Sequence, residues 1–189
     1  MGNNDVPPRW DRRMQQRLAH GEAAALGELY DRFASLVHGM AHRVLGDERG
    51  ADGVTREVFG YVWEHPEAYD PRHGSLRSWI ASLAHGQAVS RLRQAEDDDG
   101  RPAERTEQKV RAASAAARAD YIVTSMPAPL RAALDCAYLR RLDYRQTAAV
   151  LGVTEDEARR RLRLGLQLLS TAHDAPHAVA PPGLGRALR

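Results

Sequence analysis

Guanidinium groups are concentrated near the end of the chain, on the second of two helices predicted within residues 142–169. Winding this helix forward places a set of polar side chains on its outer face and flanks: Asp156, Arg159, Arg160, Arg161, Arg163 and Gln167. Arginine forms bidentate hydrogen bonds with guanine edges and with phosphate oxygens, so such a helix can read duplex DNA in the major groove. A solvated amphipathic helix is the alternative, because a run of charge often marks no more than an exposed face.

The residues around this helix favour a helix-turn-helix over that alternative. Thr154 precedes the helix and Glu157 follows three residues later, which is typical of a capping box. Gly152 stands at the expected bend, and the small Ala148 allows close packing just before it. The opposite side of the second helix carries small and apolar residues at helical spacing, which we expect to face the interior: Ala158, Leu162, Gly165, Leu166 and Leu169.

Composition indicates an all-α protein. The chain has 189 residues, of which 43% are hydrophobic and 6% aromatic, and no stretch alternates as a β-strand would. The net charge of +2 says little about partners, but its distribution is uneven. Three acidic residues at 97–99 lie mid-chain and four arginines lie within 159–163, while Lys109 is the only lysine.

Cys136 is the only cysteine, so the chain has no intramolecular disulfide and no cysteine-based zinc site. It stands among apolar residues, and we expect a buried structural thiol rather than a nucleophile. No apolar run reaches the roughly 20 residues of a membrane span, and residues 1–10 lack the apolar core of a signal peptide. We therefore expect a cytoplasmic protein that is not an enzyme and needs no cofactor or metal.

Two small helical domains joined by a flexible acidic linker are predicted. The first, residues 10–94, contains a short helix from Trp10, a second that ends at Gly46, a third over about 51–63 and a fourth over about 75–93. The linker, residues 95–119, is poor in large apolar residues and is expected to turn helical near its end. The helix-turn-helix domain spans 120–171, and residues 1–9 and 172–189 are expected to be disordered.

The strings LYDRF, VLGD, REVF-x-x-VW and YDP-x-x-GS-x-x-SW, followed by LGVT-x-x-x-A-x-x-RL, occur together in this order. With them, residues 20–94 resemble region two of extracytoplasmic-function (ECF) sigma factors, and residues 120–170 resemble region four. The resemblance implies binding to bacterial RNA polymerase core, through the β′ clamp helices and the β flap, and recognition of promoter DNA. An anti-sigma factor is a possible further partner.

The resemblance also assigns roles to residues. Those expected to bind core polymerase lie on the third helix: Asp52, Arg56, Glu57, Phe59 and Tyr61. Those expected to bind the minus-ten element lie on the fourth helix: Arg77, His85, Gln87, Ser90, Arg91 and Arg93. Those expected to bind the minus-thirty-five element lie on the arginine-rich helix: Thr154, Asp156, Arg159, Arg160, Arg161 and Arg163. Trp79 is assigned to the core rather than to base stacking.

Several positions depart from the family pattern. Gly53 stands where an acidic residue is usual, and Arg56 stands where Gln is usual. Gly86 and Ser90 stand where Asn and Asp are usual in the part that captures a flipped base. We therefore expect altered polymerase affinity and slow promoter melting. Two other functions stay open: a polymerase-binding regulator that does not melt DNA alone, and a plain helix-turn-helix regulator that never binds polymerase.

Overall fold

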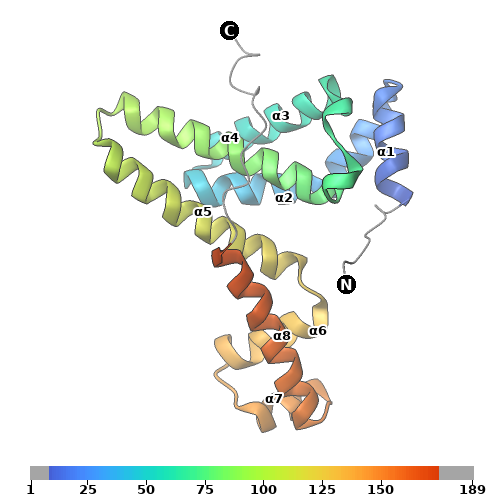
Figure 1. Cartoon of the computed structure of the whole chain (residues 1–189), viewed down its shortest axis with the longest axis vertical. Helices are drawn as coiled ribbons and strands as arrows, with labels where there is room; N and C mark the ends of the chain where they lie inside the picture. Colours follow the sequence, from blue (N-terminus) through green and yellow to red (C-terminus); the bar gives the residue numbers. More distant parts are fainter. Residues whose placement is uncertain (1–8, 175–189) are drawn as a thin grey trace. The chain divides into compact units, whose positions relative to one another are not determined.

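Over residues 9–174, the part of the chain that the structure describes, the computed structural model consists of helices and turns with no β-strand, as predicted (Figure 1). The elements are α1 (Arg9–Ala19), α2 (Ala23–Leu45), α3 (Glu48–Glu64), η1 (Pro66–Ala68), η2 (Pro71–His73), α4 (Leu76–Asp98), α5 (Ala103–Ser125), α6 (Ala128–Leu134), η3 (Asp135–Leu139), α7 (Tyr144–Leu151) and α8 (Glu155–Asp174). They form two compact units, and the boundary between the units falls within α5, between residues 114 and 115.

The first unit is built around α2, which packs against both α3 and α4. Its apolar stripe, predicted from the spacing, is buried at Leu29, Phe33 and Val37. The helix ends at Gly46, whose φ of 78° suits glycine and whose N–H donates to the His42 carbonyl at 2.8 Å. Asp47 then caps α3 by accepting a hydrogen bond from the Gly50 N–H at 2.6 Å, so α3 begins three residues before the predicted start.

Asp11 ties α1 to the beginning of α4. Its buried carboxylate accepts a hydrogen bond at 2.9 Å from the Leu76 N–H, one of the amides that a helix leaves unpaired at its N-terminus. The Tyr69 hydroxyl lies 3.4 Å from the same carboxylate and donates to the Gly74 carbonyl at 2.9 Å. Burial, with the nearby Asp11 charge, raises the pKa of Tyr69 to about 12, so its hydroxyl stays protonated near neutral pH. The start of α4 is therefore fixed from α1.

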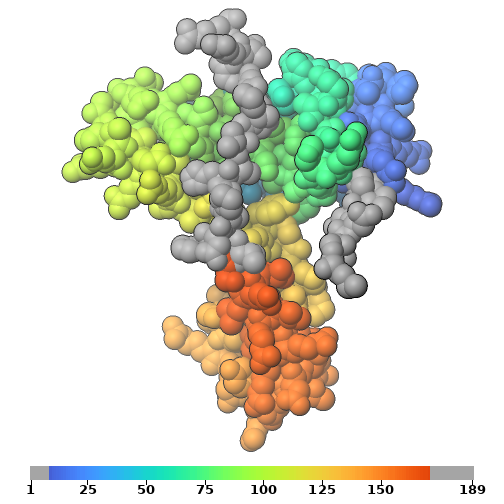
Figure 2. Space-filling view, viewed as in Figure 1, coloured from blue at the N-terminus to red at the C-terminus, as the bar shows by residue number. Residues whose placement is uncertain are grey.

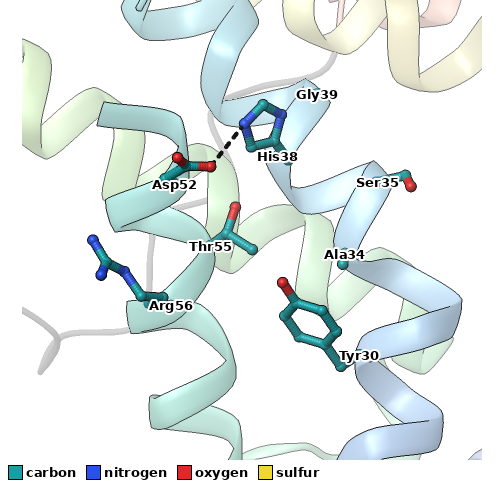
Figure 3. A pocket seen from close by; sticks show the side chains of 8 residues that line it. All are labelled: Tyr30, Ala34, Ser35, His38, Gly39, Asp52, Thr55 and Arg56. Atoms are coloured by element: carbon teal, nitrogen blue, oxygen red, sulfur yellow. Dashed lines mark ion pairs between the residues drawn. The ribbon is translucent and has the colours of Figure 1, made fainter. Parts of the chain in front are cut away.

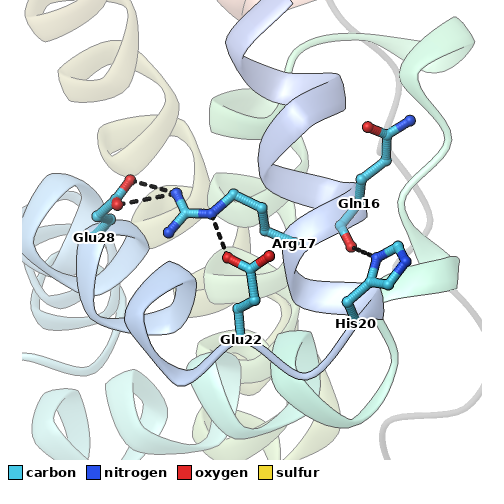
Figure 4. A network of polar contacts seen from close by, with 5 residues as sticks. All are labelled: Gln16, Arg17, His20, Glu22 and Glu28. Atoms are coloured by element: carbon cyan, nitrogen blue, oxygen red, sulfur yellow. Dashed lines mark hydrogen bonds and ion pairs between the residues drawn. The ribbon is translucent and has the colours of Figure 1, made fainter.

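Arg17 closes the corner between α1 and α2 (Figure 4). Its Nε donates to Glu22 at 2.7 Å, and its Nη1 donates to the two oxygens of Glu28 at 2.9 and 2.8 Å. The hydrogen bonding of Arg17 to Glu28 lowers the pKa of Glu28. Because the groups lie at the surface, where water screens their charges, they define the corner geometry more than they add stability.

The segment predicted as a flexible linker is largely helical, because α4 continues to Asp98 and α5 begins at Ala103. The carboxylate of Glu96 is only 6% exposed and binds Lys109 at 2.5 Å and Arg101 at 3.1 Å. Both partners lower the pKa of Glu96, and the hydrogen bond from Lys109 contributes most. The facing side of α5 uses small residues and Val110 for packing, which an inventory of large apolar residues misses. Around the turn between the end of α4 and the start of α5, the atoms of the two helices form one continuous surface (Figure 2).

The second unit packs α8 against α6 and α7. Its core consists of Met126, Ala133, Leu134 and Leu162, with partly buried neighbours such as Ile122. Cys136 is buried with a free thiol, as expected. The first helix of this unit's core begins at Ala128, as α6, and finishes as the π-helical turn η3.

The turn between α7 and α8 follows the prediction in most respects. Gly152 has a φ of 64°, and the Val153 N–H donates to the Ala148 carbonyl at 3.0 Å. Ala158 and Leu162 are buried, but Leu166 is 41% exposed, so its assignment to the interior was wrong. At this point of α8 the neighbouring Gly165, and not Leu166, faces the interior and lies against the Leu134 side chain.

The ends of the chain bear on two further predictions. Residues 172–174, predicted as part of a disordered tail, continue α8. Residues 1–8 and 175–189 lie outside the part that the structure describes, so their predicted disorder is untested. Within residues 9–174, none of the helices combines the length and the apolar character that crossing a bilayer requires.

Candidate functional site

An open groove of about 630 Å³ lies between α2 and α3 (Figure 3). It is lined by Tyr30, Ala34, Ser35, His38, Gly39, Asp52, Thr55 and Arg56. Asp52 and Arg56, both predicted to bind polymerase, are exposed at this groove. The His38 Nε2 atom lies 3.2 Å from carboxylate oxygens of both Asp52 and Glu48, so one wall of the groove is polar. A mixed surface of this kind suits a helix–helix interface with a polar rim.

The other residues predicted to bind polymerase are not at this surface. Phe59 is buried, and its ring packs 4.9 Å from that of Tyr30, so it supports the groove and does not lie on it. The predicted polymerase contact of Phe59 came from the resemblance alone, and the structure places this side chain in the packing beneath the groove. Tyr61 is half-buried and its ring lies 4.8 Å from that of His65. Glu57 turns toward α4.

Glu57 links the face of α3 predicted to bind polymerase with the face of α4 predicted to bind the minus-ten element. One oxygen of its carboxylate accepts a hydrogen bond from the Gln87 Nε2 atom at 2.5 Å, and the other binds the Arg91 guanidinium. The three side chains are partly buried between α3 and α4. A predicted polymerase contact and two predicted minus-ten contacts therefore form one network.

The remaining residues predicted to bind the minus-ten element are spread along α4. Arg77 and His85 are half-buried and Ser90 is exposed. Arg93 donates to the Glu107 carboxylate of α5 at 3.2 Å. The ring of Trp79 lies 5.4 Å from that of Tyr69, which supports its assignment to packing.

The arginine-rich helix presents its charges as predicted. The Thr154 hydroxyl caps α8 by accepting a hydrogen bond from the Glu157 N–H at 3.2 Å. The Glu157 carboxylate binds Arg161 at 2.7 Å and Arg160 at 3.3 Å, and the first of these bonds is the main cause of its lowered pKa. Asp156 is exposed and lies 3.5 Å from Arg159.

Arg159 and Arg163 also line a second groove, of about 520 Å³, with Tyr138, Tyr144 and Leu166 among its other walls. The guanidinium of Arg159 lies 5.2 Å from the ring centroid of Tyr144, at cation–π distance. Arg163 is exposed, and among the described side chains no acidic group forms an ion pair with it. The side of α8 predicted to face DNA thus combines acid-paired arginines with one that is not acid-paired among the described side chains.

Among the described residues, no group of three or more His, Cys, Asp or Glu side chains is arranged to hold a metal ion. The polar clusters of both units are charge pairs between arginine or lysine and carboxylates.

Comparison with known proteins agrees with this geometry. Residues 29–97 match the family described as Sigma-70 region 2. The ECF RNA polymerase sigma factor SigK of Mycobacterium sp. (strain KMS) is 30% identical over 168 residues, covering 80% of this chain and 84% of the relative. This chain belongs to the ECF family of RNA polymerase sigma factors.

Other relatives of the ECF family match over shorter stretches or with lower identity. SigK of Mycobacterium tuberculosis (strain ATCC 25177 / H37Ra) is 36% identical over 78 residues, which is 41% of this chain and 42% of the relative. The structure of CnrH in complex with the cytosolic domain of CnrY aligns over 87% of this chain and 97% of that chain, at 22% identity and a TM-score of 0.36. That structural likeness is too weak to support a functional inference.

Two features of this ECF protein were not anticipated from its sequence. One is Asp11, whose partners on the α3–α4 loop and α4 lie more than 50 residues away. The other is the position of Gly53, which the sequence marks only as a departure from the acidic residue usual in the family. In the structure it lies beside Arg91. No local pattern could reveal either, because both depend on pairing between elements distant in the chain.

Proposed function

We propose that this protein is a sigma factor that binds bacterial RNA polymerase core and directs it to specific promoters. In this proposal, the groove between α2 and α3 binds polymerase through Asp52 and Arg56, α4 contacts the minus-ten element, and α8 enters the major groove of the minus-thirty-five element. The protein acts by binding rather than by catalysis, in the bacterial cytoplasm. An anti-sigma factor stays a prediction from family membership.

The observation that carries the proposal is the set of exposed guanidinium groups on α8, those of Arg159, Arg160 and Arg163. This set stands on a helix whose other side is buried at Ala158 and Leu162, and the Gly152 turn fixes that helix against α7. A buried stripe behind an arginine-rich face is the form that a recognition helix requires. Family membership then links this helix to polymerase-directed transcription.

Pull-down with core polymerase followed by a run-off transcription screen tests the proposal. Core binding with promoter-dependent transcripts is expected. Core binding without transcripts would instead support a polymerase-binding regulator that does not melt DNA alone, an alternative favoured by the pairing of Arg93 with Glu107. DNA binding without core binding would support a plain helix-turn-helix regulator.

A further inference from the structure

Gly53 lies against the Arg91 guanidinium, on the side of α3 that faces α4. A Cβ atom built on Gly53 would lie 2.5 Å from Nη1, 3.0 Å from Nη2 and 3.1 Å from Cζ of Arg91. The shortest of these distances is below any ordinary contact between a carbon and a nitrogen atom. Glycine is therefore the residue that leaves room for the guanidinium where it lies.

Glu57, one helical turn after Gly53, holds the same guanidinium by a hydrogen bond. Its second oxygen holds Gln87, which stands one turn before Arg91 on α4. An arginine has five N–H donors in a planar fork, and Glu57 binds one nitrogen of this fork. The Arg91 side chain is still 34% exposed, so part of the guanidinium faces solvent while its position is fixed from α3.

We propose that Gly53 and Glu57 are positioning residues, which hold Arg91 so that its solvent-facing donors bind a phosphate of single-stranded promoter DNA. This inference rests on the proposed function and adds to it the α3 residues that prepare the DNA face of α4. A mobile arginine loses rotamer freedom when it binds a phosphate, and an arginine already fixed by a carboxylate loses less. Gly53 thus has a use in this chain, where an acidic residue is usual in the family.

Gly53→Ala tests the inference, and Gly60→Ala on the same helix is the matched control. No heavy atom would lie within 4 Å of a Cβ on Gly60, so the control gains helix propensity and leaves Arg91 in place. At Gly53 the obstructing atoms are the far end of a flexible side chain, so the fold survives while the guanidinium moves away. We expect both variants to keep a cooperative thermal unfolding transition.

Binding of the full chain to a short fluorescent single-stranded DNA of mixed sequence, measured by anisotropy at low salt, gives the decisive readout. Gly53→Ala should weaken binding about tenfold, the equivalent of one charge-assisted hydrogen bond. It should also reduce the slope of log affinity against log salt by about 0.7, as expected for one lost phosphate contact. Gly60→Ala should bind like the unmodified chain.

The same change in an Arg91→Ala background distinguishes positioning from a general disturbance of α3. If Gly53 acts through Arg91, Gly53→Ala should weaken DNA binding no further once Arg91 is absent. Unchanged affinity of the single variant, additive losses in the double variant, or no DNA binding by the unmodified chain would each overturn the inference. None of these outcomes bears on core binding, so a failed pull-down with core polymerase would identify failure of the proposed function separately.

Discussion

Arginine side chains on α8 differ in what they must give up to bind DNA. Arg159 lies near Asp156 and over the Tyr144 ring, and Arg160 and Arg161 both pair with Glu157. Ion pairs near the surface contribute about 0–1 kcal/mol each, so an arginine can leave its acid at little cost, but until it does so the acid occupies some of its N–H donors. Arg163 carries no such acidic partner among the residues that the structure describes.

Arg163→Ala should therefore weaken binding to a minus-thirty-five duplex more than Arg160→Ala does. We expect a loss of about 1–3 kcal/mol with relaxed specificity at one base pair if Arg163 reads a guanine edge. Competition binding against duplexes that differ at single positions measures both effects. Normal binding by both variants would show that this side of α8 does not face the DNA.

Gly165 of α8 lies against the Leu134 side chain of α6. An added Cβ would lie 2.9 Å from Cδ1 and 3.0 Å from Cγ of the buried Leu134, so Gly165→Ala should overpack the second unit. Overpacking typically costs about 1–3 kcal/mol, which exceeds the gain of about 1 kcal/mol in helix propensity. Chemical denaturation should show a net loss of stability that shrinks in a Leu134→Ala background. A more stable Gly165→Ala chain would mean that Leu134 moves freely.

At the scale of helices, local signals predicted what local forces determine. The end of α2 at Gly46 and the Gly152 turn both follow from backbone conformations available to single residues. The start of α4 was also predicted, and Ser75 caps it locally, whereas the pairing of α5 with the end of α4 depends on the buried Glu96, a contact that the sequence does not display. For the same reason the candidate α3 and α4 faces were predicted as separate sites, although Glu57 joins them.

The pairing between α4 and α5 should depend on pH through Glu96. Lys109 and Arg101 lower the pKa of this carboxyl group in the folded chain. The stabilisation is therefore present above the ordinary Glu pKa of about 4.3 and is lost as pH falls through the lower, folded value. Glu96→Gln should lower the melting temperature at neutral pH and reduce its further fall in acid. Glu104→Gln, an exposed neighbour on α5, should leave the acid response unchanged.

At the scale of the whole molecule, the two units differ in the surface they expose. In the described part of the first unit, Tyr30 is the one large hydrophobic side chain that stands exposed, and it lines the groove between α2 and α3. The second unit exposes Tyr138, Leu139, Tyr144, Val150, Leu164, Leu166 and Leu168. Of these, Tyr138, Tyr144 and Leu166 line the second groove together, and contiguous apolar exposure marks surfaces that bind other macromolecules. Both units therefore carry surface suited to a large partner.

Core polymerase binding should depend on Arg56, which lines the groove of the first unit. Arg56→Glu reverses an exposed charge without touching the core, so we expect weaker association with core polymerase and unchanged helical content. Arg12→Glu, on the exposed side of α1, is the matched control. Glu57→Lys is a poorer probe, because Lys would stand beside Arg91 and disturb α4 as well. Equal competition by both variants for core would exclude this groove as the binding site.

Promoter melting is where this chain departs furthest from its relatives. Gly86 offers no side chain to hold a flipped base, and Ser90 is an exposed hydroxyl in place of an acid. Base capture offsets an unstacking cost of a few kcal/mol, so its loss should slow opening of the promoter. Gly86→Asn should therefore accelerate opening by the reconstituted holoenzyme, as followed by permanganate reactivity of unpaired thymines. Gly60→Ala serves as the control for helix propensity, and rapid, complete opening by the unmodified holoenzyme would show that Arg91 and its neighbours suffice without a side chain at position 86.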